Sequence, residues 1–582
     1  MTRAAASGGG PTWTLFPPQR FARRWGVVAT TGTGDTPAGT DAATFAAMVH
    51  AHRLGGPPDL PDPGHAALAV ARHGAILVLD PCTPRPDAAA RAAVAARLGI
   101  VLTQAVARAA GRPVLVLPHP SAPHRARPAL VAWPGARVLP HRLASWTLLD
   151  AAAEIHLVAP APGEHDPIAA LAGAAAIPLF MDGQARDATA AWIAALAATV
   201  WTCPFHGTPI APADGLALLA QWRMVAAQNR RVAAITGIPV WKRASLAPLF
   251  AHARGTPAFR AAPGAALKRA EKRHGALVAW ASAMPPALPA AAAAAGVPLL
   301  RLEDGFVRGA GLGARFLPGA SWCLDSQGVH YDPAAPSDLE ALLQAGGVPA
   351  AVLARAAALR DTIVRRGVSK YNLAPHPAPA LPAGRRIVLV TGQVEDDASM
   401  RAVTGAVRSN LALLRAVRAA EPDGYILYKP HPDLVAGYRH GRIAQADLVG
   451  LADAVETATP LPGLLPHVHA LHTITSLSGF EALLRGVPVI CWGQPAYAGW
   501  GLTEDRDPIP RRTRRLTLDE LVAGMLILYP RYLDPVTRLP CGPEILLDRL
   551  GDASLWRGSP WAVHREVQGF VTRFFARLRR LS

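Results

Sequence analysis

The chain has 582 residues and a formal net charge of +18, from 59 Lys and Arg against 41 Asp and Glu. Hydrophobic residues make up 51% of it and charged residues 17%, a composition that excludes an intrinsically disordered chain. Its five Cys include no Cys-x-x-Cys pair, which argues against a disulfide framework and a structural zinc site and is typical of a reducing compartment.

The N-terminal part of the chain contains an irregular segment and then a repeat. The irregular segment is residues 1–64, and its first 28 residues include no apolar stretch of signal-peptide length. From Ile76 the sequence reads as a strand, a polar loop, a helix and a second strand that leads to His119-Pro, 43 residues on. The same order begins at Ile387 and leads to His431-Pro, 44 residues on. A repeat of this length indicates a duplicated domain.

One stretch imitates a membrane span, because residues 275–300 carry no charge. It contains four prolines, which are unfavourable inside a helix. We therefore expect a strand over ALVAW, a helix over LPAAAAAAG and a strand over VPLLRL.

Strand and helix patterns alternate through most of the chain, which predicts an α/β fold with Rossmann-like, doubly wound parallel sheets. The later copy of the repeat has polar residues after its strands, whereas the earlier copy has Leu117 where the later one has Lys429. The earlier copy is therefore predicted to be a degenerate Rossmann-like domain without a site. The predicted divisions are 1–64, the degenerate domain 65–230, two further Rossmann-like domains at 231–380 and 381–545, and a C-terminal basic amphipathic helix at 546–582.

Basic residues concentrate in two places, and no nucleic-acid-binding motif accompanies them. RDPIPRRTRR at 506–515 carries five Arg, and the C-terminal tail has apolar residues at helical spacing with Arg between them. The tail helix is predicted either to pack on its own domain or to lie on a membrane surface. No nucleic-acid partner is expected.

Polar clusters follow four predicted strands, where open parallel sheets bind their ligands. Glu303 and Asp304 precede Gly305, which predicts either a general acid or base or a turn. Gln393 and three acids that end at Asp397 follow the strand IVLVT. A carboxylate there could act as a nucleophile in glycosyl transfer, or it could favour a helix N-terminus.

The other two clusters combine a cation, an imidazole and a helix start. Lys429 and His431 lie in KPHP, where a Lys suits a phosphate and a His can donate to an oxyanion or move a proton. TSLSGFE includes Ser476, Gly479 and Glu481. It is predicted to form a capping box from Ser478 to Glu481, a phosphate and ribose site, or both.

Together the clusters indicate a nucleotide-dependent enzyme with an acid in one half and a phosphate and ribose site in the other. This is the layout of a GT-B glycosyltransferase. The Asp505-Arg-Asp507 sequence matches the pattern of a metal–nucleotide site only weakly, and no metal is expected.

The motifs RLEDGFVRG, GQVEDDAS, YKPHPD, HTITSLSGFEALLRG and YAGWGLTED together resemble the KpsC (LipA) family of capsular polysaccharide biosynthesis proteins. The resemblance is strong over roughly 236–540 and faint over 65–230. It implies a retaining β-Kdo transferase of a Gram-negative bacterium, which uses CMP-Kdo as donor and needs no cofactor. Residues 231–380 would be the acceptor-side domain and residues 381–545 the CMP-sugar-binding domain.

The resemblance also implies an acceptor, partners and a location. The acceptor would be a Kdo-primed lysophosphatidylglycerol, on which the linker for capsular polysaccharide is built. Capsule assembly and export proteins are the implied partners, in the cytoplasm or peripherally on the inner face of the inner membrane. Family members carry two tandem modules, so this chain resembles an intact second module that follows the later half of a decayed first one.

The resemblance assigns roles residue by residue. The catalytic residues that it implies are Asp397 as nucleophile, Asp304 or Glu303 as general acid/base, and His431 beside the leaving phosphate. The donor-binding residues that it implies are Gln393, Lys429, Ser476, Gly479 and Glu481. The chain departs from the family pattern at Ala496 and at Arg308-Gly309, where Phe and Arg-Ser are expected.

Three alternatives stay open at this point. A catalytically inactive scaffold of the capsule assembly and export complex would have lost all its sites. A CMP-dependent transferase of another nonulosonic acid, such as sialic acid, would differ around the sugar carboxylate. A nucleic-acid binder would bind any duplex in a salt-sensitive way.

Overall fold

A computed structural model describes residues 29–31, 42–54, 65–79, 88–117, 133–139, 144–158, 167–197, 199–252, 255–309, 319–370, 372, 376–435, 439 and 441–556. The predicted tail helix from residue 557 and His119 lie outside the described residues. The chain divides into two compact units. The first comprises residues 1–228 with 252–255, and the second comprises residues 229–251 with 256–582.

The first unit contains a six-stranded sheet in the order β4-β3-β2-β5-β6-β7. Its first five strands are parallel, and β7 pairs antiparallel with β6 at the edge. The strands are β2 (Ala75–Leu79), β3 (Val114–Leu117), β4 (Ala136–Val138), β5 (Ala152–Leu157), β6 (Leu179–Met181) and β7 (Gln184–Arg186). The helices are α1 (Ala42–Ala51), α2 (Ala88–Arg108), α3 (Ser145–Ala151), α4 (Pro167–Ala174), α5 (Ala188–Ala197) and α6 (Pro212–Arg230). A separate two-stranded antiparallel sheet, formed by β1 (Ala29–Thr31) and β8 (Thr199–Trp201), also belongs to this unit.

The second unit begins with a seven-stranded sheet in the order β10-β9-β11-β12-β13-β20-β21. Its strands are β9 (Val232–Thr236), β10 (Ala258–Arg260), β11 (Ala276–Trp280), β12 (Leu299–Asp304), β13 (Ser321–Asp325), β20 (Pro530–Leu533) and β21 (Pro540–Cys541). The four strands from β10 to β12 are parallel. Buried apolar side chains pack on both faces of this sheet, as expected of a doubly wound sheet.

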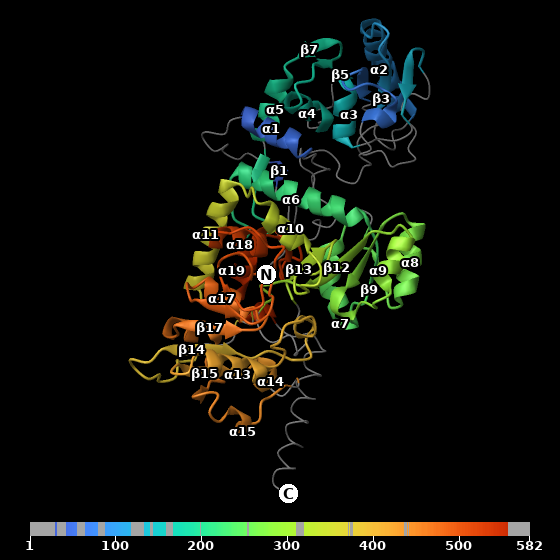
Figure 1. Ribbon diagram of the computed structural model, residues 1–582. Coiled ribbons are helices and arrows are strands. Elements are labelled where there is room, and N and C mark those ends of the chain that lie inside the picture. The colour runs from blue at the N-terminus through green and yellow to red at the C-terminus, as the bar shows by residue number, and fades with distance from the viewer. Residues whose placement is uncertain are drawn as a thin grey trace. The chain divides into compact units, whose positions relative to one another are not determined.

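The helices of this region are α7 (Val240–Leu246), α8 (Pro263–Lys272), α9 (Leu288–Ala294), α10 (Asp338–Ala345) and α11 (Ala350–Arg365). Helices α8 and α9 lie beside β9 and β12 in green in Figure 1. The strand, helix and strand predicted for the uncharged stretch are confirmed as β11, α9 and β12. No single helix in the described ranges is long and apolar enough to cross a membrane, although the bent pair α10 and α11 passes a test of length and composition.

A second, all-parallel sheet has the order β16-β15-β14-β17-β18-β19. Its strands are β14 (Ile387–Thr391), β15 (Tyr425–Lys429), β16 (Ala454–Val455), β17 (Ala470–Thr473), β18 (Val489–Cys491) and β19 (Glu504–Asp505). The helices are α12 (Ala398–Arg401), α13 (Asn410–Ala420), α14 (Pro432–Val435), α15 (Gln445–Leu448), α16 (Leu461–Leu464) and α17 (Ser478–Leu483). Figure 1 shows this region in orange, with α13 beside β14 and β15.

The all-parallel sheet and the sheet of the first unit share their strand order, because both run third, second, first, fourth, fifth and sixth along the chain. Leu79 and Leu117 are register partners at the ends of β2 and β3. Thr391 and Lys429 are partners at the ends of β14 and β15. The shared order agrees with the repeat that was inferred from the sequence, and apolar side chains end β2 and β3 in the earlier copy.

The C-terminal part of the second unit returns to the seven-stranded sheet. Helix α18 (Leu518–Val522) continues into a π-helix over Ala523–Leu528, and β20 then pairs antiparallel with β13. Helix α19 (Pro543–Leu550) follows β21. This corrects the predicted division at 381–545, because β20 and β21 belong to the sheet of the preceding region. Nothing in the local pattern of these strands shows which sheet they join.

Candidate active site

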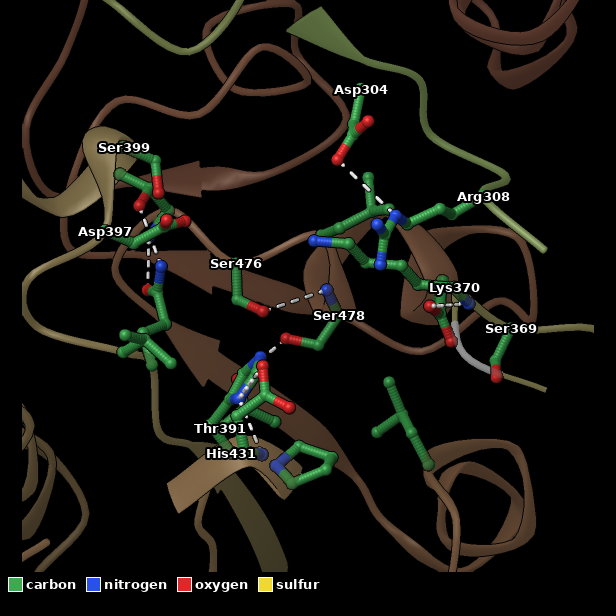
Figure 2. A pocket seen from close by; sticks show the side chains of 18 of the residues that line it. Asp304, Arg308, Ser369, Lys370, Thr391, Asp397, Ser399, His431, Ser476 and Ser478 are labelled. Atoms are coloured by element: carbon green, nitrogen blue, oxygen red, sulfur yellow. Dashed lines mark hydrogen bonds and ion pairs between the residues drawn. The ribbon is translucent and has the colours of Figure 1, made fainter. Parts of the chain in front are cut away.

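A cavity of about 770 Å³ lies in the second unit, where the carboxyl ends of β12, β14, β15 and β17 meet. In open parallel sheets, ligands bind at these ends, next to the point where the strand order reverses. Eight of the nine predicted site residues line the cavity: Glu303, Asp304, Gln393, Asp397, Lys429, His431, Ser476 and Glu481. Figure 2 labels four of them, Asp304, Asp397, His431 and Ser476. The structure thus brings these residues together, and their chemical roles stay predictions.

Gly479 does not appear among the cavity-lining residues, and its neighbours give it a packing role. A Cβ at this position would lie 2.2 Å from the Tyr497 hydroxyl. The absent side chain therefore gives room to Tyr497, whose hydroxyl donates to the carbonyl oxygen of Ser476. Gly305 is similar, since a Cβ there would lie 2.4 Å from the Ser321 hydroxyl. Gly305 supplies close approach to Ser321 rather than the left-handed turn considered from the sequence.

Glu303 and Asp304 end β12 with different surroundings. Asp304 accepts from Lys242 Nζ at 3.0 and 3.1 Å and pairs with Arg308 Nε at 3.4 Å. Burial opposes its ionisation, but the two cations hold the pKa of Asp304 below its usual value. Glu303 Oε2 is buried and has no hydrogen-bond partner among the described residues. Burial and the neighbouring Asp304 charge raise the pKa of Glu303 to about 7, where a general acid or base works best at neutral pH.

The three consecutive acids after β14 have three different surroundings. Glu395 Oε1 accepts from the backbone N–H of Asn410 at 2.7 Å, at the start of α13. Asp396 pairs with Arg439 at 2.9 Å. Asp397 precedes α12, and its exposed carboxylate makes no capping hydrogen bond to that helix. Asp397 is therefore the acid of the three that lines the cavity without holding a structural contact of this kind.

The Gln393 side chain is occupied by a loop contact. Its Nε2 donates to Thr475 Oγ1 at 2.9 Å, and its Oε1 accepts from the backbone N–H of Thr475 at 2.8 Å. The amide thereby ties the loop after β14 to the loop after β17. This pairing uses both ends of the amide and explains why a Gln suits the position.

Lys429 and His431 lie together after β15. Lys429 Nζ donates to the carbonyl oxygen of Thr459 at 2.6 Å, and burial lowers its pKa. Burial, followed by the charges of Lys370 and Arg439, lowers the pKa of His431 to about 3. Its Nδ1 accepts from the backbone N–H of Asp433 at 3.1 Å, so Nε2 carries the proton of the neutral ring. His431 is thus built as a neutral donor, which disfavours the proton-moving role considered from the sequence.

Helix α17 starts beside Thr391, with which the Ser478 hydroxyl shares a hydrogen bond of 2.8 Å. The predicted capping box is not formed, because Glu481 Oε1 accepts instead from the backbone N–H of Lys370 at 2.9 Å. Glu481 Oε2 is buried and has no partner in the described part of the chain. Burial raises the pKa of Glu481. A buried oxygen of this kind is costly unless a ligand donates to it.

Sequence reasoning missed several cavity residues, namely Lys242, His330, Tyr331 and Lys370. Lys242 lies on α7, with its ammonium 3.8 Å from the centre of the Trp280 ring and bonded to Asp304. Lys370 lies in the connection between the two sheets. Isolated side chains of this kind follow no spacing rule. The only signal was the rarity of Lys in a chain rich in Arg.

Two other features noted in the sequence, the Asp505-Arg-Asp507 sequence and the basic segment 506–515, make contacts that stabilise the fold. Asp505 accepts from the backbone N–H of Gly499 at 2.8 Å and from Thr503 Oγ1 at 2.7 Å. No group of three metal-binding side chains is found within the described ranges, and the expectation of a metal-free reaction stays a prediction. In the basic segment 506–515, Arg512 Nε binds Glu340 Oε2 at 2.8 Å and Arg511 also pairs with Glu340. These Arg side chains connect α10 to the loop after β19.

Comparison with known proteins places this site in a family. Residues 275–532 match the family described as "Capsule polysaccharide biosynthesis protein". The chain is 44% identical over 248 residues to the capsule polysaccharide modification protein LipA of Neisseria meningitidis serogroup A, covering 43% of this chain and 35% of LipA. It is 30% identical to the β-Kdo 2,7 transferase of Thermosulfurimonas dismutans KpsC, covering 55% of this chain and 98% of that structure, with a TM-score of 0.46. The chain belongs to the KpsC/LipA family.

The chain is also similar to the lipopolysaccharide-processing protein LpsZ of Rhizobium meliloti, with 43% identity over 240 residues, which are 40% of this chain and 54% of LpsZ. The β-Kdo 2,4 transferase of T. dismutans KpsC is 29% identical, covers 55% of this chain and 97% of that structure, and has a TM-score of 0.48. The chain spans about a third to a half of the length of the curated relatives. The resemblance inferred from the motifs is confirmed, and so is the link to capsule polysaccharide biosynthesis.

Proposed function

We propose that the second unit is a GT-B glycosyltransferase that moves Kdo from CMP-Kdo, with a β linkage, to a Kdo-terminated phospholipid acceptor. The observation that carries the proposal is the cavity itself. It gathers Glu303 and Asp304 from one sheet opposite Asp397, Lys429 and a buried Glu481 oxygen, which has no partner within the described ranges, from the other. An acid on one side and a nucleotide site on the other are what a sugar transferase needs. The two KpsC structures named above, which are described as β-Kdo transferases, support the choice of sugar.

The donor would bind at the ends of β14, β15 and β17. Lys429 and the Nε2–H of His431 would donate to the phosphate of CMP, and Glu481 Oε2 would accept from a ribose hydroxyl. A neutral His431 suits this role, because it donates without needing a proton from solvent. The positive charge of Lys429 would stabilise the phosphate as it departs.

Chemistry would proceed in two displacements. The Asp397 carboxylate attacks the anomeric carbon, the bond from that carbon to the phosphate oxygen breaks, and CMP leaves with the electron pair. Glu303 then takes the proton of the acceptor hydroxyl, whose oxygen bonds to the anomeric carbon and releases Asp397. Two inversions retain the configuration of the sugar. Asp304 would stay ionised between Lys242 and Arg308 and position the loop after β12.

The deciding measurement is CMP release from CMP-Kdo with a synthetic Kdo-terminated acceptor. We expect turnover by the wild-type chain and a loss of about 10³-fold or more for Asp397→Ala. Asp396→Ala is the matched control, since it removes the adjacent acid, and it should keep activity within a few-fold. Product from CMP-sialic acid but not from CMP-Kdo would indicate a transferase of that other sugar. A folded chain that turns over neither donor would favour the scaffold.

A further inference from the structure

The chain uses Lys sparingly and concentrates it in the cavity. Five of its 59 basic residues are Lys and the other 54 are Arg. Three of those five, Lys242, Lys370 and Lys429, line the cavity, and the remaining two lie on α8. A Lys ammonium is a compact point charge, whereas the Arg guanidinium is a broad planar fork. In a chain that otherwise uses Arg, a cavity lined by Lys indicates positions where a small cation is required.

Lys242 and Lys429 belong to parts of the site already described. Lys242 is bonded to both oxygens of Asp304, and Lys429 lies at the proposed phosphate position and donates to Thr459. The backbone N–H of Lys370 is held by Glu481 Oε1, which fixes the residue where the connection between the sheets passes the cavity. Figure 2 shows Lys370 and Ser369 on the same side of the cavity as Arg308.

The charge of Lys370 reaches groups from both sheets. After burial, it is the largest influence that lowers the pKa of His330, to about 4, and that of His431, to about 3. It also acts on Asp304 at the end of β12 and on Asp433 after β15. Lys370 therefore lines the cavity at a place from which its charge acts on residues of both sheets.

A second observation indicates a ligand at the same place. His330 Nδ1 is buried, lines the cavity and has no hydrogen-bond partner in the described ranges. The ring is held by edge contacts with Phe306, at 4.9 Å between ring centres, and with Tyr529, at 6.0 Å. A buried ring nitrogen without a partner costs free energy unless a ligand completes its hydrogen bond. Because both tautomers of a neutral imidazole are accessible, His330 can donate through Nδ1 to an anion.

We infer that Lys370 and His330 form the subsite for a sugar carboxylate, and that this subsite selects a donor whose anomeric carbon carries an acid group. The assignment rests on the proposed function and adds to it. The sugar of a nucleotide sugar must lie between the nucleotide and the acceptor-activating Glu303, inside the cavity that Lys370 and His330 also line. A carboxylate on the anomeric carbon would then lie beside the reacting bond. Aldose donors have no group to pair with this cation.

The test compares two ligands on the full-length chain, CMP-Kdo and CMP. For Lys370→Met we expect affinity for CMP-Kdo to fall about 10- to 100-fold, the range for a charge-assisted hydrogen bond, while affinity for CMP changes less than about threefold. His330→Phe should show the same selective loss, of about tenfold. Lys268→Met, at an exposed position on α8, is the control and should change neither affinity. Lys429→Met should weaken both ligands.

The outcomes separate the assignment from the proposed function. An equal loss of CMP and CMP-Kdo in Lys370→Met would overturn the assignment and make Lys370 a phosphate ligand. Unchanged affinities for both ligands in a folded Lys370→Met would overturn it as well. If the wild-type chain binds CMP-Kdo no more tightly than CMP, the assignment of the carboxylate subsite is wrong, while the nucleotide site remains. A wild-type chain that binds neither ligand would overturn the proposed function and the assignment together.

Discussion

At the residue scale, Glu303 and Asp304 show how much of the site depends on burial. The sequence predicted two acids at a strand end but could not rank them. Lys242 and Arg308 decide the ranking, because both contact Asp304 and leave Glu303 Oε2 without a partner among the described residues. Lys242 comes from a helix about 60 residues earlier in the chain, so no local spacing relates it to Asp304. The positions of the acids were thus predictable, whereas their pKa values required the fold.

The first prediction concerns the pH dependence of transfer. The pKa of Glu303 is raised to about 7 by burial and by Asp304, so a base at this position is protonated in mild acid. We expect kcat/KM to rise about tenfold per pH unit below neutrality and to level off above about pH 7. Glu303→Gln should lower the rate by about 10²- to 10⁴-fold. The measurement is the pH profile of CMP release at limiting donor.

Asp304→Asn provides the matched control for this profile. The substitution removes a negative charge beside Glu303 and so lowers the pKa of Glu303. The inflection of the pH profile should therefore move to lower pH, while substantial activity remains. An inflection that stays in place in Asp304→Asn would show that another group titrates. A full loss of activity in Asp304→Asn, together with a mild effect of Glu303→Gln, would mean that Asp304 is the general base and Glu303 is not.

At the element scale, the C-terminal part of the second unit joins its two sheets. Strands β20 and β21 return to the seven-stranded sheet, and the basic segment after β19 binds α10 through Glu340. Sequence reasoning noted the five Arg of this segment but predicted neither β20 nor β21. The pairing of β20 with β13 was also out of reach, because the two strands are separated by about 200 residues and long-range pairing leaves little trace in local patterns.

The second prediction is that Glu340 stabilises the second unit. Arg512 and Glu340 side chains are 4% and 8% exposed, and Arg512 Nη1 also donates to Pro495 and Ala498 carbonyl oxygens. Removing one partner of a buried pair costs about 3–5 kcal/mol. We expect Glu340→Ala to lower the free energy of unfolding by that amount. Glu544→Ala, which removes a half-exposed partner of Arg355, should cost at most about 1 kcal/mol.

The same pair predicts a pH dependence of stability. Burial opposes the ionisation of Glu340, but hydrogen bonds from Arg511 and Arg512 hold its pKa below 4.5 in the folded chain. The folded state therefore binds fewer protons than the unfolded state, and the pair contributes stability above about pH 4.5 that is lost as the pH falls through the folded pKa. The free energies of unfolding of wild type and Glu340→Ala, measured with denaturant, should converge only as the pH falls well below 4.5. A difference that is independent of pH would contradict this role of the charge.

At the scale of the whole molecule, two sheets with one strand order differ in the side chains at the ends of their strands. Leu79 and Leu117 end β2 and β3, where Thr391 and Lys429 end β14 and β15. The fold of the earlier copy rests on buried apolar strands such as β2, whose five residues are all buried. A sheet can therefore be stable without polar groups at the ends of its strands, because burial supplies most of its stability. The alternation of strands and helices made this duplication visible in the sequence.

The third prediction is that the chain holds one nucleotide. Of the two matching sheets, the later one provides a cavity with Lys429, His431 and Glu481 at its strand ends, so titration calorimetry with CMP should give one site per chain. Glu481→Gln keeps the side-chain size and an oxygen for the Lys370 N–H but loses the charge, and it should weaken CMP binding about tenfold or more. Glu154→Gln in β5 of the first unit, which removes the charge that pairs with Arg108 and Arg112, should leave CMP affinity unchanged. Two equivalents of CMP, or a tight site that persists in Glu481→Gln, would mean that the earlier copy still binds a nucleotide.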